Sequence, residues 1–124
     1  MLDDRPVRLA TRTGTIVNIP YSQECNDVAM IAVQHQRAVE YRDRAIDQFE
    51  QLYAEAKESA RVMALVVHPY LMGVPHRLRY FREALEHISA RPGVAFMTGE
   101  EIYDWYATQP ADPVANLRTA QKEG

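Results

Sequence analysis

The sequence predicts an α/β domain in which parallel strands alternate with helices. Residues 37–57 have the apolar periodicity of a long helix, and residues 62–67 are apolar on both faces, as in a strand inside a parallel sheet. A helix from residue 75, a short apolar run at 94–97 and a last helix repeat the alternation. Parallel strands need crossover connections, so this order favours parallel pairing. Two strands buried on both faces need neighbours, and the sheet is therefore expected to be incomplete.

The N-terminal part is expected to be extended. Apolar residues in the segment 7–19 flank a turn-like pair, Thr13-Gly14, which predicts a hairpin or an irregular strand pair. The pair Asn26-Asp27 offers a helix N-cap, and a short helix is expected from Val28.

Three longer helices follow. Ala38, Ala45 and Phe49 belong to the apolar stripe of the helix at 37–57. The next helix begins near Pro75, a residue suited to a first helical turn, and Arg91-Pro92-Gly93 ends it.

The last helix follows the second expected strand, Val94–Met97. Thr98 and Glu101 have the spacing of a capping box, which predicts that this helix begins near residue 99. Ile102, Trp105 and Tyr106 are its expected apolar anchors, and Phe96 and Trp105 are expected in the core. Residues 1–109 are thus expected to form a partial domain, and residues 110–124, with two prolines and no periodicity, a flexible tail.

Composition narrows the function classes. The chain has 124 residues, 25% of them charged, and a net charge of −3, which gives no general attraction to nucleic acid or acidic membranes. No apolar stretch approaches the ~20 residues of a membrane span, and the N-terminus lacks a signal-peptide core, so a cytoplasmic protein is expected. The single cysteine, Cys25, excludes an intrachain disulfide and is expected to be a buried, unreactive thiol.

His68 is the main chemical candidate, because it follows the apolar strand at 62–67. Ligands and catalytic groups gather at the carboxyl ends of parallel strands. A neutral imidazole there could act as a general acid, or it could be a buried histidine bonded to a backbone carbonyl. Tyr70 lies in the loop 69–74 that would face the same crevice, where it would either bind substrate or pack.

The other polar candidates favour solvated helix faces. His35, His76 and His87 lack the spacing with which one helix face holds zinc, and we expect no metal and no cofactor. Three arginines on the helix from residue 75 could hold an anion, but acidic residues within helical reach favour ion pairing. The arginines are Arg77, Arg79 and Arg82, and acidic residues expected to pair on helices are Asp47, Glu50, Glu83 and Glu86.

Several motifs together resemble a known family. The strand end with His68-Pro69, the Gly73-Val74-Pro75 loop, the helix opening Arg77-Leu78 and the stretch Gly93–Trp105 occur in the order typical of the C-terminal part of polysaccharide deacetylases, particularly the allantoinase-like members. Upstream segments, including Pro20-Tyr21 and Asn26-Asp27, also resemble that subgroup.

The resemblance implies a fold and a chemistry. It implies the C-terminal part of a distorted (β/α) barrel of the NodB-like deacetylase type, and a hydrolase that cleaves amide-type carbon–nitrogen bonds in carbohydrate derivatives or cyclic ureides. His68 matches the family's late strand-end histidine, which is a catalytic position. The family's aspartate pair and His-x-x-x-His metal motif have no counterpart here, since Asp3-Asp4 stands in a different context.

Three interpretations follow from this partial match. The chain is a truncated hydrolase domain that is inactive alone, or it assembles with a complementary N-terminal half and then acts on a small amide or ureide. In the third, it is a non-enzymatic module that associates with itself through a free sheet edge. Amide hydrolysis needs an activated water and a stabilised oxyanion, and one histidine does not supply both.

Overall fold

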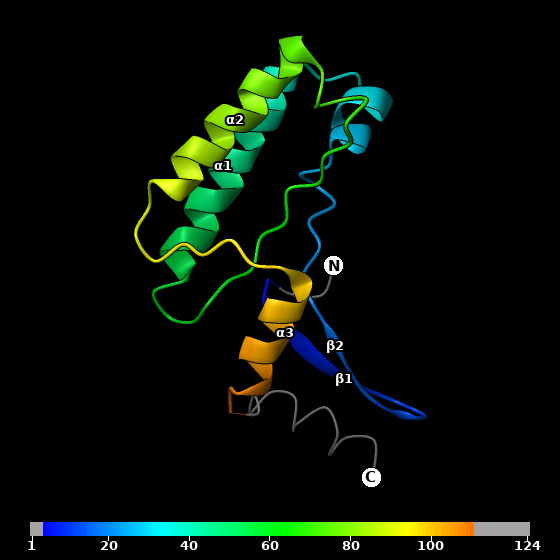
Figure 1. The fold of residues 1–124 in the computed structure, drawn as a ribbon, viewed down its shortest axis with the longest axis vertical. Helices are drawn as coiled ribbons and strands as arrows, with labels where there is room; N and C mark the ends of the chain where they lie inside the picture. Colours follow the sequence, from blue (N-terminus) through cyan, green and yellow to red (C-terminus); the bar gives the residue numbers. More distant parts are fainter. Residues whose placement is uncertain (1–3, 111–124) are drawn as a thin grey trace. The chain divides into compact units, whose positions relative to one another are not determined.

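The computed structural model describes residues 4–110 of the chain (Figure 1). The described residues form two compact units, the first made of residue 4 with residues 20–96 and the second of residues 5–19 with residues 97–110. Nearly all of the expected tail lies outside the described residues. Between residues 4 and 110, no helix is both long and apolar enough to cross a lipid bilayer.

The first unit is built on two adjacent helices, α1 (Ala38–Glu55) and α2 (Pro75–Ser89), which lie along each other in Figure 1. Both helices were predicted from the apolar periodicity. Residues of the α1 stripe are buried at three- and four-residue steps, namely Ala38, Tyr41, Ala45, Phe49 and Leu52. Pro75 occupies the first turn of α2, and Gly93, with a φ of 80°, turns the chain after it.

The core of this unit lies where a short π-helical segment, η1 (Val28–Val33), meets α1 and the loop that precedes α2. Its buried residues come from these three parts of the chain and are Met30, Ile31, Ala38, Tyr41, Leu71 and Met72. The short helix expected from Val28 is therefore present, with a wider turn than an α-helix. This core fixes the loop around residue 70 against η1.

The prediction of a buried parallel strand at 62–67 was wrong. These residues are extended and half-buried, and their single ladder contact within residues 4–110 is a parallel bridge between Asn26 and Val66. Asp27 N donates to Val66 O at 3.1 Å, and Val66 N donates to Cys25 O at 2.9 Å. A longer ladder does not form because the residues before Cys25 turn instead of running alongside.

The second expected strand, Val94–Met97, is also absent. This segment has no ladder partner among residues 4–110, and the Phe96 side chain is 65% exposed instead of buried in the core. The prediction that this apolar run is a buried strand was wrong, because no strand of the described chain lies beside it.

The second unit contains a hairpin and a helix. Strands β1 (Val7–Thr11) and β2 (Gly14–Asn18) pair antiparallel, which confirms the expected hairpin. Helix α3 (Gly99–Ala107) begins with the expected capping box: Glu101 N donates to Thr98 Oγ1 at 3.2 Å, and Thr98 N donates to Glu101 Oε2 at 2.6 Å.

Tyr106, one of the expected apolar anchors of α3, is buried, whereas the prediction that Trp105 lies in the core was wrong. Trp105 is 39% exposed, whereas the next residue, Tyr106, is buried. The Arg8 guanidinium lies 4.5 Å from the centre of the Tyr106 ring and donates to Tyr106 O. Tyr106 thus packs beneath an arginine of β1, a cation–π contact that the apolar pattern of α3 alone did not indicate.

Candidate functional site

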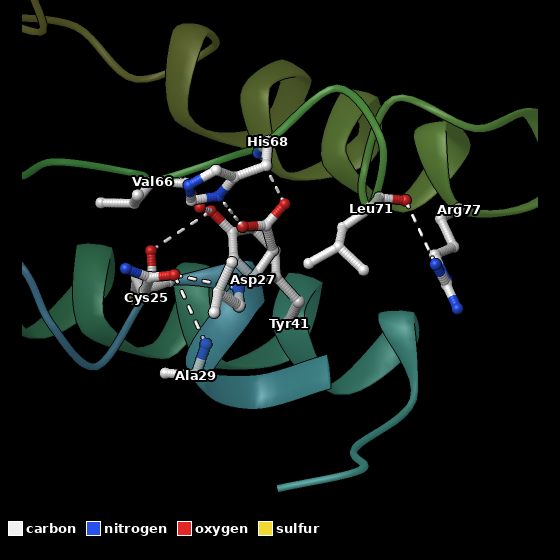
Figure 2. A network of polar contacts seen from close by, with 10 residues as sticks. Cys25, Asp27, Ala29, Tyr41, Val66, His68, Leu71 and Arg77 are labelled. Atoms are coloured by element: carbon white, nitrogen blue, oxygen red, sulfur yellow. Dashed lines mark hydrogen bonds and ion pairs between the residues drawn. The ribbon is translucent and has the colours of Figure 1, made fainter. Parts of the chain in front are cut away.

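Two segments that are distant in the sequence bring Asp27 and His68 together (Figure 2). The parallel bridge between Asn26 and Val66 aligns the segments, so that the residues after the bridge on both sides lie at the same end. Asp27 Oδ2 accepts from the main-chain N–H of His68 at 2.7 Å, and Asp27 Oδ1 lies 2.6 Å from His68 Nδ1. Asp27 is fully buried, whereas the His68 side chain is 40% exposed. The buried carboxylate of Asp27 therefore orients a histidine that is partly exposed to solvent.

This geometry fixes the proton on the imidazole. An ionised carboxylate only accepts hydrogen bonds, so Nδ1 of His68 carries the hydrogen that faces Asp27. In the neutral ring, Nε2 then has a free lone pair. Nε2 makes no hydrogen bond to any residue between 4 and 110, and the side chain that carries it is 40% exposed. The ring can accept or deliver a proton at Nε2 without losing its bond to Asp27.

The sequence placed Asp27 in a helix cap, and the structure corrects this. Asn26 is the residue that caps η1: its Oδ1 accepts from Val28 N at 2.9 Å and from Ala29 N at 3.4 Å. Asp27 makes no side-chain cap bond. One capping side chain is enough for the free N–H groups at the start of a helix. The presence of two capping residue types in a row, Asn26 and Asp27, was therefore a sequence signal that one of them bonds elsewhere.

Tyr41 of α1 bonds to the two segments that carry Asp27 and His68. Its side chain is fully buried, and its hydroxyl donates to Cys25 O at 3.4 Å and to Val66 O at 3.2 Å. These are the carbonyls of the bridge that aligns Asp27 with His68. Burial raises the pKa of Tyr41 far above its usual value, with Cys25 and Asp27 adding to the shift, so the phenol remains a donor.

Cys25 is buried, as predicted for an unreactive thiol. Burial raises its pKa to about 11, against an opposing contribution from Arg44. A thiol with this pKa carries almost no thiolate near neutral pH and is a poor nucleophile. Cys25 therefore contributes its backbone carbonyl to the site rather than its sulfur.

The loop after His68 presents Tyr70 at the surface. Leu71 N and Met72 N both donate to His68 O at 3.0 Å, and both side chains are buried. Tyr70, between these anchors and the histidine, is 67% exposed, and its ring centre lies 6.0 Å from that of His68. The structure thus brings the two predicted site residues side by side. The substrate-binding role of Tyr70 stays a prediction.

The other predicted candidates lie away from this pair. His87 Nε2 lies 2.6 Å from Glu50 Oε1, which also accepts from Arg91, and Glu83 pairs with Arg42 at 2.6 Å. Glu50 and Glu83 thus form ion pairs, as expected, but with partners on the other helix or just after it rather than with neighbours on their own helix face. Arg77 donates to Leu71 O at 3.4 Å and so helps to hold the loop of Tyr70.

The described residues do not fit a metal centre of their own. Among residues 4–110, no three histidine, cysteine, aspartate or glutamate side chains lie close enough together to hold a metal ion. Both carboxylate oxygens of Asp27 are bonded to His68, so this pair offers a cation one ring nitrogen, Nε2 of His68. We derive no chemical step through a metal from these residues.

Comparisons with known proteins support a relationship to deacetylases, although no family model matches the sequence. A protein of Schizosaccharomyces pombe assigned to the polysaccharide deacetylases is 34% identical over 110 residues, which cover 82% of this chain and 34% of the relative. The chain thus spans about a third of the length of this curated relative.

Two crystal structures share the fold. The Puue allantoinase has a TM-score of 0.79 and 27% identity, with 89% of this chain matched to 38% of that chain. A protein of Pseudomonas aeruginosa PAO1 described as a probable polysaccharide deacetylase has a TM-score of 0.78 and 24% identity over the same shares. These structures support the α/β fold class. The resemblance predicted from the sequence is confirmed: the chain is a relative of the polysaccharide deacetylases and matches one part of their fold.

Proposed function

We propose that this chain supplies the proton-transferring histidine of a hydrolase that cleaves amide-type carbon–nitrogen bonds, as the deacetylase and allantoinase relatives suggest. The observation that carries the proposal is the Asp27–His68 pair. A buried carboxylate orients the ring through Nδ1 and leaves Nε2 available at a half-exposed position. This is the arrangement by which an aspartate sets the tautomer of a catalytic histidine.

The role of His68 follows from the chemistry of the bond. Water adds to the carbonyl carbon and gives a tetrahedral intermediate, which collapses by breaking the carbon–nitrogen bond. The nitrogen is a poor leaving group until it is protonated. The protonated imidazole of His68 donates the Nε2 proton to this nitrogen and becomes neutral, while Asp27 keeps the ring in place.

The remaining groups of the site have to come from elsewhere in the fold. A hydrolase also needs a group that activates water and donors that stabilise the oxyanion. Among residues 4–110, no three histidine, cysteine, aspartate or glutamate side chains gather as a metal centre, and the carboxylate beside His68, Asp27, is already bonded to it. We therefore infer that the chain corresponds to part of a distorted barrel, that the remaining part of the deacetylase-like fold completes the site, and that the isolated chain is inactive.

A chimera tests the proposal. Residues 4–110 replace the matched segment of the Schizosaccharomyces pombe relative, and the product is assayed for acetate release from N-acetylated sugar oligomers and for opening of the cyclic ureide allantoin. We expect activity on one of these substrates. His68→Gln lowers the rate by about 10²–10⁴, the usual contribution of a general acid.

His87→Gln is the matched control, because it removes a histidine that is paired with Glu50 rather than with Asp27. We expect this variant to retain activity. A folded chimera whose rate does not change in His68→Gln contradicts the proposal, as does an inactive chimera beside an active parent enzyme.

A further inference from the structure

Tyr70 lies in a turn whose other residues are firmly held. Leu71 N and Met72 N both donate to His68 O at 3.0 Å, and the side chains of Leu71 and Met72 belong to the buried core of the first unit. Gly73 leaves no room for a side chain, because a Cβ there would lie 2.5 Å from a backbone oxygen of the same turn. The turn is therefore anchored without Tyr70, whose side chain is 67% exposed.

The rings of Tyr70 and His68 meet at an angle. Their centres are 6.0 Å apart and their planes are inclined by 67°, which is the geometry of an edge-to-face aromatic pair. Two rings inclined in this way form the walls of a corner. A group that stacks on the Tyr70 ring at a distance of about 3.5–4.0 Å therefore lies beside the imidazole that we propose as the proton donor.

The loop that carries Tyr70 is uncharged. Residues 69–74 contain no acidic or basic side chain, and the carboxylate of Asp27 is fully buried and bonded to His68. Small-molecule sites are lined mainly by apolar and aromatic groups, with a few polar groups that set the orientation of the ligand. An aromatic face in an uncharged loop suits the flat face of an uncharged ring, because ring faces stack on aromatic side chains whatever polar groups they carry at their edges.

We propose that Tyr70 determines substrate specificity: its ring stacks against an uncharged ring that carries the scissile carbon–nitrogen bond, and it thereby favours ring-borne amides and ureides over open-chain amides. The inference rests on the proposed hydrolase function, since His68 has to act in the same corner. Stacking holds the bond beside Nε2 of His68, and a tyrosine on a fixed backbone loses little conformational entropy when it binds.

Substitutions of Tyr70 in the chimera test this role. On N-acetylated sugar oligomers or on allantoin, we expect Tyr70→Ala to lower kcat/KM about tenfold, whereas Tyr70→Phe, which keeps the ring, restores most of the loss. The loss on N-acetylethanolamine, an open-chain amide, should be much smaller. A loss confined to the sugar oligomers identifies a sugar ring, and one confined to allantoin identifies a ureide ring. Tyr103→Ala is the control, because it removes a tyrosine that is 50% exposed on α3.

Binding gives a second readout that does not depend on turnover. In a chimera that carries His68→Gln, calorimetric titration with the same ring compounds should show that Tyr70→Ala raises the Kd about tenfold. An unchanged Kd, or no binding of either ring compound, overturns the inference. Equal losses of kcat/KM on ring and open-chain substrates overturn it too, since they show that Tyr70 packs against the rest of the fold, and so does an equal loss in Tyr70→Phe. The proposed function fails separately, if His68→Gln leaves the rate unchanged.

Discussion

Asp27 and His68 are 41 residues apart in the sequence, and the two carboxylate oxygens of Asp27 bind two different nitrogens of His68. One oxygen holds the main chain and the other holds the ring. The histidine is therefore fixed in position and in rotation by a single fully buried residue. A side chain prepared in this way needs no rearrangement before it transfers a proton.

The first prediction concerns the energy of this pair. We expect the effects of Asp27→Ala and His68→Ala on the free energy of unfolding to be non-additive, with an interaction energy of about 0.5–3 kcal/mol, because the residues are in direct contact. Urea unfolding of both single variants and the double variant measures it. Additive effects would show that the contact contributes nothing to stability.

The second prediction concerns Tyr41, which holds the bridge beneath the site. Tyr41→Phe removes the bonds to Cys25 O and Val66 O, but each carbonyl keeps a main-chain donor. We expect a loss of about 0.5–1.5 kcal/mol in the free energy of unfolding. Tyr53→Phe is the control, because its hydroxyl bonds to Pro92 O in an exposed position, and it should cost less. The reverse order would contradict this account.

The third prediction concerns the loop that presents Tyr70. A Cβ at Gly73 would lie 2.5 Å from Pro69 O, so Gly73→Ala forces the backbone of the loop to move. We expect a loss of about 1–3 kcal/mol and a changed NMR environment for the Tyr70 ring. Gly99→Ala meets no atom within 4 Å and should be neutral or slightly stabilising. Equal effects of the two substitutions would show that the loop is not tightly constrained.

The fourth prediction concerns pH. Hydrogen bonds from His87 and then Arg91 lower the pKa of Glu50 below its usual 4.5. A carboxyl group whose pKa falls on folding stabilises the folded state above its unfolded pKa, and this contribution is lost as the pH falls through the folded value. Melting temperatures measured between neutral and acidic pH should therefore fall at the acid end. In Glu50→Gln part of this fall should disappear, and an unchanged pH profile would contradict the assignment.

The helices could be predicted from the sequence because each is marked by a pattern within its own residues. The apolar spacing from Ala38 to Leu52 and the Thr98–Glu101 capping box are local patterns, and the structure places α1 and α3 at nearly the expected bounds. Which aromatic residue of α3 is buried was harder to predict. Trp105 and Tyr106 are neighbours in the sequence, and Tyr106 is the one that packs against Arg8 of β1.

The structure of the two apolar runs at 62–67 and 94–97, and half of the site, could not be predicted in the same way. An apolar run such as Val62–Val67 indicates that a strand would be stable, but it does not say what lies beside it, and here Asn26 forms the one ladder contact. The sequence predicted that His68 and Tyr70 lie together at the end of an extended segment, and the structure places their ring centres 6.0 Å apart. Asp27 was missed because its partner is remote in sequence and its neighbour Asn26 has the same capping chemistry.

The central claim is that Asp27 fixes the tautomer of His68, and ¹⁵N NMR of the His68 ring tests it most directly. In the neutral ring we expect a protonated Nδ1 and a bare Nε2. Asp27→Asn should reverse this: its amide oxygen has to accept from the His68 main-chain N–H, so its NH₂ group faces the ring and turns Nδ1 into an acceptor. A protonated Nε2 in the unsubstituted chain, or one tautomer in both proteins, would contradict the account.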